Sequence, residues 1–165
     1  MTSAEVASFL ERFQTLVMAS QTPDGVPHAS TAPFVYEGGN FYILISTVAQ
    51  HGRNLLVSRY VSLLFAEDES QCHQPFARKR ITIEAAVSEV ARSEAEYARI
   101  IESFKHRFDT ELVSSLSGMG DFHLFRLVPQ NGSAVMGFGK AYRLNEHLEV
   151  MTQIMGQHQK GNSNG

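Results

Sequence analysis

Two arginines near the middle of the chain could bind an anion together. The run Phe76–Val90 alternates apolar and polar residues, which predicts a β-strand with Arg78 and Arg80 on the same face. Two planar guanidinium groups side by side suit a phosphate or a carboxylate. The same charges also occur on solvated edge strands, where they oppose aggregation. The sequence leaves both interpretations open.

A second candidate anion site lies where a short helix is expected, over Gln50–Arg59. Free N–H groups and the dipole at a helix N-terminus favour an anion, and Arg53 could clamp it there. The candidate binding residues of this segment are Ser46, Thr47, His51, Arg53 and Asn54. An ordinary helix cap with an exposed charge would produce the same pattern.

The seven histidines do not form a recognisable zinc motif, because no two have the i, i+4 spacing of a zinc-protease helix. The single cysteine, Cys72, excludes an intramolecular disulfide and any cysteine-rich metal site. His158 lies in Gly156–Gly165, whose composition is typical of a mobile tail. By composition alone, His158 would be a solvent-exposed side chain, and Asp121, directly after Gly120, a turn residue.

The composition indicates one compact domain that acts on a small ligand. Of the 165 residues, 43% are hydrophobic and 19% are charged, which suits a folded domain with a sizeable core. The net charge of −3 and the lack of a long basic stripe argue against nucleic acid as the main partner. The longest apolar run, around Phe41–Ile45, is far too short for a membrane span, and the N-terminus lacks signal-peptide features. We therefore expect a cytoplasmic protein with no membrane partner.

Turn residues and apolar periodicity divide the chain into strands with helices at the start, middle and end. Capping boxes at Thr2 with Glu5 and at Ser93 with Glu96 predict the starts of two helices. Strands are expected at residues 15–20, 26–36, 41–46, 60–66 and 76–90, and as a hairpin of 121–128 and 133–144, before a last weak helix at 147–155. Because consecutive strands are joined by tight turns, the pattern favours an antiparallel sheet closed into a small barrel.

Several segments together resemble the HutZ/HugZ family of heme utilisation proteins, within the flavin-binding split-barrel superfamily related to pyridoxamine-phosphate oxidase. The matching stretches are Ala29–Val35, His51–Leu55, Glu67–Asp68, Phe76–Arg80 (FARKR), Asp121–Leu127 (DFHLFRL) and Gly137–Tyr142 (GFGKAY). The resemblance implies a mainly β, six-stranded antiparallel split β-barrel with flanking helices over residues 1–155. Residues 156–165 would form a flexible tail that carries the candidate heme ligand.

The resemblance also implies a homodimer with two equivalent sites at the subunit interface. His158 would bind the heme iron, and Asp121 would accept a hydrogen bond from that histidine across the dimer, fixing the imidazole tautomer. The implied activity is O₂-dependent cleavage of the porphyrin with release of iron, in which heme is both substrate and cofactor and an external donor supplies electrons. Arg78 and Arg80 would then hold the heme propionates.

Two alternatives stay open at this point. In the flavin-binding relatives, the region matching Ser46–Asn54 holds the FMN phosphate, so the chain could be an FMN-dependent oxidase or reductase. It could also be a non-catalytic heme carrier. Asp121 together with a C-terminal histidine favours heme, whereas Ser46, Thr47 and Arg53 are compatible with FMN.

Overall fold

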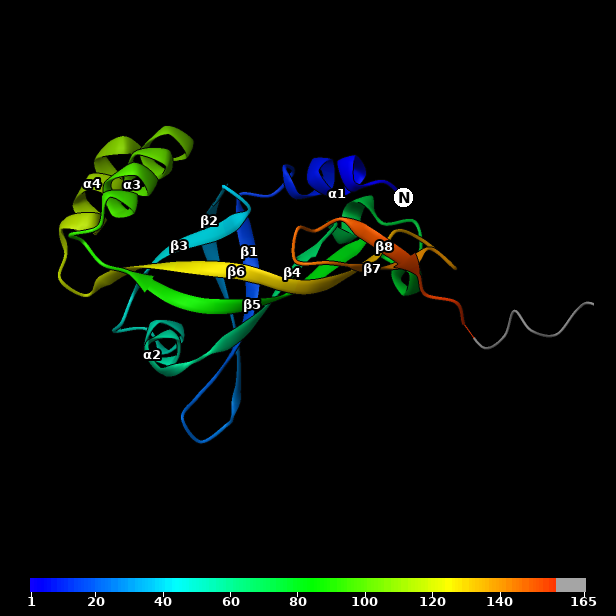
Figure 1. Cartoon of the computed structure of the whole chain (residues 1–165), viewed down its shortest axis with the longest axis horizontal. Helices are drawn as coiled ribbons and strands as arrows, with labels where there is room; N and C mark the ends of the chain where they lie inside the picture. Colours follow the sequence, from blue (N-terminus) through cyan, green and yellow to red (C-terminus); the bar gives the residue numbers. More distant parts are fainter. Residues whose placement is uncertain (157–165) are drawn as a thin grey trace, which may run out of the picture.

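The computed structural model describes residues 1–156 (Figure 1). Residues 157–165, which include His158, lie outside the described part of the chain. The elements in chain order are α1 (Ser3–Leu10), β1 (Thr15–Gln21), β2 (Pro27–Glu37), β3 (Asn40–Ser46), α2 (Gln50–Val57), β4 (Tyr60–Ala66), 3-10 turns at Glu69–Gln71 and Pro75–Ala77, β5 (Arg80–Val90), α3 (Ala95–Arg107), α4 (Thr110–Gly118), β6 (Phe122–Val135), β7 (Ala141–Leu144) and β8 (Val150–Gln153). None of the helices in this part of the chain is long and apolar enough to cross a membrane.

The strands form one antiparallel sheet in the order β3-β2-β1-β4-β5-β6-β7-β8. β3 also pairs with β6, with register partners that run from Phe41 and Leu127 to Ser46 and Phe122. This additional pairing closes β1 to β6 into a six-stranded barrel, while β7 and β8 continue the sheet beyond β6. The closed barrel confirms the predicted fold class.

Alternation along the strands fills the barrel with apolar side chains. In β1, Leu16 and Met18 are buried and their neighbours are exposed; in β5, Ile81, Ile83 and Ala85 are buried, as the alternation predicts. Each fully buried aliphatic side chain of this size contributes about 2 kcal/mol through burial. Helix α1, which begins with the predicted capping box, adds its own apolar face to this core.

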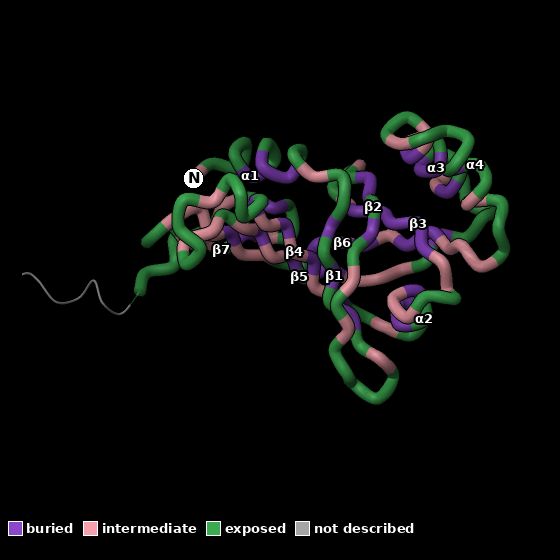
Figure 2. Tube along the Cα trace, turned by 180° about the vertical axis from the view of Figure 1, so that it is seen from behind, coloured by how far each residue is buried: buried purple, intermediate pink, exposed green. Residues whose placement is uncertain are grey.

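The helical hairpin of α3 and α4 packs against the outside of the barrel, over β3 and β6 (Figures 1 and 2). Ile100 and Phe104 of α3 form a second apolar cluster with Leu44 of β3 and Leu124 of β6. The hairpin and the β7–β8 pair therefore lie at opposite ends of the long axis of the molecule (Figure 1).

β5 begins at Arg80, so the prediction of a strand from Phe76 onward is wrong. Pro75 fixes a backbone angle that suits a turn, and Pro75–Ala77 form a 3-10 turn instead. Arg78 consequently lies in the loop before β5 rather than beside Arg80 on one strand face.

The C-terminal part of the sheet also differs from the sequence prediction. β6 runs unbroken through Pro129, because a bulge pairs Ala85 with Pro129 and Glu84 with Asn131, leaving Gln130 as the extra residue. The predicted hairpin turn at residues 129–132 is therefore wrong. The predicted last helix is also wrong, since β8 gains backbone partners by pairing with β7, whereas a short isolated helix is only marginally stable.

Candidate functional site

The end of β3 and the start of β6 bring Ser46, Thr47 and Asp121 together. The Ser46 hydroxyl donates to Asp121 Oδ2 at 2.5 Å, across 75 positions of sequence. The Thr47 N–H and hydroxyl both donate to the Asp121 carbonyl oxygen, at 2.8 and 3.2 Å. The β3–β6 pairing thus fixes the backbone of Asp121 and one oxygen of its carboxylate. We call these three residues the Asp121 corner.

Helix α2 packs against the backbone of Ser46 and Thr47 in the Asp121 corner. A Cβ atom on Gly52 would lie 2.1 Å from the Ser46 carbonyl oxygen, so only glycine allows this close approach. The Asn54 side chain is fully buried; its amide group donates to the Ser20 hydroxyl at 3.0 Å and accepts from Gln50 at 2.7 Å. Gly52 and Asn54 therefore attach α2 to the barrel.

Arg53 and His51 were predicted to bind an anion at the start of α2. The Arg53 guanidinium donates to the Val48 carbonyl and, at 2.8 Å, to the Gln50 side chain, so two of its five N–H donors have partners within the chain and hold the group against the β3–α2 connection. His51 is half-buried, and its Nδ1 has no hydrogen-bond partner among residues 1–156. Burial, with a smaller contribution from nearby His28, lowers the pKa of His51, so its imidazole is neutral at pH 7.

The structure does not bring Arg78 and Arg80 to the Asp121 corner of the same chain. Arg80 pairs with Val135 at the last residue of β6, whereas Asp121 immediately precedes the first. Arg78 donates through Nε to the Glu67 carbonyl at 2.6 Å, and Arg80 donates to the Arg78 carbonyl at 2.9 Å. The expected pair of parallel guanidinium groups on one strand face is therefore not formed.

The described chain ends far from Asp121. Gln153 of β8 pairs with Tyr142 of β7, which pairs with Ala134 near the end of β6. At about 3.3 Å per residue, Ala134 lies roughly 40 Å along β6 from Asp121. In Figure 1 the α4–β6 junction and β8 lie at opposite ends of the molecule.

No group of three or more metal-ligating side chains occurs within residues 1–156. The candidate iron ligand, His158, lies outside the described residues, so its placement stays a prediction.

Comparison with known proteins establishes the family. Residues 2–136 match the family model for pyridoxamine 5'-phosphate oxidase. Over 141 residues, the chain is 40% identical to the heme oxygenase HutZ of Vibrio cholerae, covering 86% of this chain and 80% of that protein. The chain belongs to the HutZ family. This confirms the resemblance that the sequence motifs indicated.

Solved structures of similar proteins show the same fold. V. cholerae HutZ, described there as a heme storage protein, superposes with a TM-score of 0.72 at 39% identity, covering 77% of this chain and 89% of that one. ChuZ of Campylobacter jejuni superposes with a TM-score of 0.80 at 30% identity, covering 92% of this chain and 61% of ChuZ. A heme binding protein of Mycobacterium smegmatis shares the fold at 20% identity, with a TM-score of 0.76.

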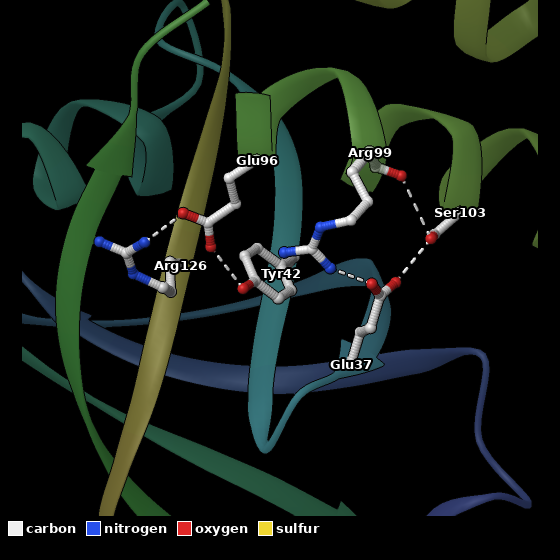
Figure 3. A network of polar contacts seen from close by, with 6 residues as sticks. All are labelled: Glu37, Tyr42, Glu96, Arg99, Ser103 and Arg126. Atoms are coloured by element: carbon white, nitrogen blue, oxygen red, sulfur yellow. Dashed lines mark hydrogen bonds and ion pairs between the residues drawn. The ribbon is translucent and has the colours of Figure 1, made fainter. Parts of the chain in front are cut away.

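Sequence reasoning missed a polar network that holds α3 on this HutZ-family barrel (Figure 3). Glu96 was interpreted as half of a capping box, but α3 begins after Glu94 and has no side-chain cap bond. Instead, the Glu96 carboxylate accepts from the Tyr42 hydroxyl at 2.6 Å and from the Arg126 guanidinium. These bonds, led by the one from Tyr42, lower the pKa of Glu96, while burial and the neighbouring carboxylate raise the pKa of Tyr42.

The second half of this network joins α3 to the end of β2. Glu37 accepts hydrogen bonds from the Ser103 hydroxyl at 2.6 Å and from the Arg99 guanidinium (Figure 3). Tyr42 and Arg126 are register partners on β3 and β6, a relationship that appears only once the barrel is closed. No signal in the sequence pairs these residues.

Arg92 was also missed, although it holds the segment that contains Asp121. Its guanidinium donates to the carbonyl oxygens of Ser117, Met119 and Phe122, the last two at 2.8 and 3.0 Å. These carbonyls precede and follow Asp121, so Arg92 fixes the path of the chain from α4 into β6. The α3–α4 hairpin therefore determines where the Asp121 backbone lies.

A cavity of about 480 Å³ lies along α1, and a second of about 360 Å³ adjoins it beside the loop between β4 and β5. Both are lined by Arg12, Lys79 and Met136, and Lys140 borders the larger one. They belong to the end of the molecule that carries β7 and β8 rather than to the Asp121 corner.

Proposed function

We propose that this HutZ-family protein binds heme and cleaves its porphyrin with O₂, releasing the iron for use by the cell. The observation that carries the proposal is the hydrogen bonding of the two Asp121 carboxylate oxygens. Ser46 occupies Oδ2, and no residue between 1 and 156 donates a hydrogen bond to Oδ1. A rigidly held carboxylate with one free oxygen suits a histidine N–H, the common arrangement behind a metal-bound imidazole.

His158 is the proposed ligand of the heme iron, and Asp121 the acceptor of its second ring N–H. That bond fixes the imidazole tautomer, orients the ring and increases its basicity toward iron. When bound, heme supplies both the iron that activates O₂ and the porphyrin that is cleaved, with electrons from an external donor. The chain itself contributes binding, orientation and the charge of Asp121.

The Asp121 corner suits an FMN phosphate less well. The hydroxyl groups of Ser46 and Thr47 donate to Asp121, and two of the five N–H donors of Arg53 are bonded to Val48 and Gln50. A phosphate placed here would also meet the Asp121 carboxylate, and two like charges in contact repel each other. These contacts support heme rather than FMN as the ligand, and FMN binding is kept as a distinct outcome of the test.

The proposed site needs two copies of the chain. Five residues from Gln153 extend at most about 18 Å, so His158 cannot cover the roughly 40 Å to Asp121 of its own chain. A second copy with its β8 end against the first copy's Asp121 corner would bring its own His158 within reach of that aspartate. We therefore propose a homodimer in which each site combines Asp121 of one subunit with His158 of the other.

The outer face of the barrel supports a second copy as its partner. Apart from Glu37 at the end of β2, which bonds to α3, the outward positions of β1, β2 and β4 carry no charged residue, and depletion of charge is typical of the centre of a protein interface. These positions are Thr15, Val17, Ala19, Gln21, Pro27, Ala29, Thr31, Pro33, Tyr60, Ser62, Leu64 and Ala66. In sedimentation, Val17→Lys should convert a dimer into a monomer, and Ser114→Lys, on exposed α4, should not. A wild-type monomer would contradict the dimer.

Subunit complementation tests the shared site directly. Asp121→Asn and His158→Ala homodimers should each have defective sites, and His158→Ala should lack the Soret band of the histidine-bound complex. When subunits exchange in an equimolar mixture, about half of the dimers are mixed, and each mixed dimer has one intact site. About a quarter of all sites should then degrade heme at the wild-type rate. A mixture no more active than its components would show that the two residues do not form a site across the dimer.

A further inference from the structure

The Ser46 hydroxyl both accepts and donates a hydrogen bond within the chain. A serine hydroxyl has one proton to donate and lone pairs that accept. The Val48 N–H donates to Ser46 Oγ at 3.1 Å, and the Ser46 hydroxyl donates to Asp121 Oδ2 at 2.5 Å. The start of the β3–α2 turn therefore orients the hydroxyl, and the hydroxyl in turn points its proton at the carboxylate.

The backbone of Asp121 is held independently of its side chain. Thr47 donates twice to its carbonyl oxygen, and Arg92 bonds carbonyls on both sides of it. These contacts leave the two side-chain torsions of Asp121 open, and the terminal torsion, which rotates the carboxylate, has only broad preferences. Among residues 1–156, Ser46 is the side chain that donates to this carboxylate and sets its rotation.

We propose that Ser46 is a positioning residue that sets the rotation of the Asp121 carboxylate and so presents Oδ1 to the imidazole of the partner subunit. This inference deepens the proposed function and rests on it. Ser46 would act through Asp121, without contacting heme, and would not bind an FMN phosphate. Removing the hydroxyl should let the carboxylate rotate and misalign its bond to the histidine, while leaving the carboxylate in place.

The test compares Ser46→Ala, Ser46→Thr and, as a matched control, Ser115→Ala on the exposed surface of α4. Losing the support of a metal ligand typically weakens metal affinity 10- to 100-fold, so Ser46→Ala should weaken hemin binding by about 10-fold. The iron–histidine stretching frequency of the ferrous complex should also fall, because the imidazole is less polarised. Ser46→Thr keeps a hydroxyl and should restore both values, and Ser115→Ala should match the wild type.

A double-mutant cycle with Asp121→Asn separates this inference from the proposed function. If Ser46 acts through Asp121, Ser46→Ala should change affinity and frequency little further in the Asp121→Asn background. If Asp121→Asn shifts both readouts and Ser46→Ala shifts neither, the Ser46 proposal is wrong and the Asp121 role stands. If Asp121→Asn itself shifts neither, both assignments are wrong.

Urea unfolding of the apoproteins shows whether Ser46→Ala acts by destabilising the fold. If Ser46→Ala unfolds at a lower urea concentration than the wild type, Ser46→Cys is tested in its place, because a thiol is a weak hydrogen-bond donor of similar size. An iron–histidine frequency equal to the wild-type value in Ser46→Cys would then overturn the proposal.

Discussion

Replacing Gly52 with alanine should move α2 away from the Asp121 corner. The added Cβ would lie 2.1 Å from the Ser46 carbonyl oxygen, 2.7 Å from the Ser46 carbonyl carbon and 2.9 Å from Thr47 Cα. All three atoms belong to the backbone of the β3–α2 connection, so no side chain can rotate to make room. The helix or the end of β3 must shift, and this shift would also disturb the bond from Ser46 to Asp121.

The expected cost is the difference between two opposing effects. Overpacking against backbone costs about 3 kcal/mol, and the better helix propensity of alanine returns up to about 1 kcal/mol. The net loss of about 2 kcal/mol corresponds to a fall in Tm of roughly 4–8 °C for a domain of this size. Gly118, at the end of α4, is the matched control, because a Cβ there meets no atom within 4 Å.

Thermal and urea unfolding of the two apoproteins, followed by circular dichroism, measure this difference. Gly52→Ala should unfold at lower temperature and lower urea concentration than the wild type. Gly118→Ala should be at least as stable as the wild type. If Gly52→Ala is as stable as Gly118→Ala, the close packing of α2 on Ser46 is wrong, and so is the described geometry of the Asp121 corner.

Three further variants test other parts of the structure. Tyr42→Phe removes a hydrogen bond to the charged Glu96 and should lower the free energy of unfolding by about 1.5 kcal/mol in urea, whereas Tyr97→Phe, whose hydroxyl has no partner among residues 1–156, should not. The pKa of His51 is lowered in the folded chain from its ordinary value of 6.5. Below pH 6.5, the unfolded chain therefore binds more protons than the folded chain. Stability should therefore fall as pH drops from about 7 to 5, and less so in His51→Asn, by urea midpoints. Thr2→Ala breaks the capping box of α1 and should cost about 1 kcal/mol in the same assay; an unchanged midpoint would contradict that cap.

Local patterns in the sequence predict most of the barrel. The alternation from Arg80 to Val87 correctly identifies the inward face of β5, and Thr2 with Glu5 correctly marks the start of α1. The errors arise where tertiary structure overrides a local signal. Pro129 suggested a turn, but a bulge opposite Ala85 accommodates it within β6.

The contacts that build the candidate site are not visible in local patterns. Ser46 and Asp121 are 75 positions apart, and nothing in either segment indicates their bond before β3 and β6 are paired. The predicted anion ligands Arg53 and Asn54 have suitable chemistry, but Arg53 also bonds Val48 and Gln50 of its own chain, and Asn54 is fully buried and bonded to Ser20. Asp121 was identified through the family resemblance, since alone it reads as a turn residue.

Absorption titration with hemin tests the central claim most directly, with FMN titrated in parallel. We expect a Soret band that saturates at one heme per chain and then bleaches when ascorbate is added in air, with release of iron that a ferrous chelator detects. A Soret band that persists under ascorbate and O₂ would contradict heme cleavage and identify a heme carrier. Tight FMN binding without a Soret band would contradict heme as the ligand altogether.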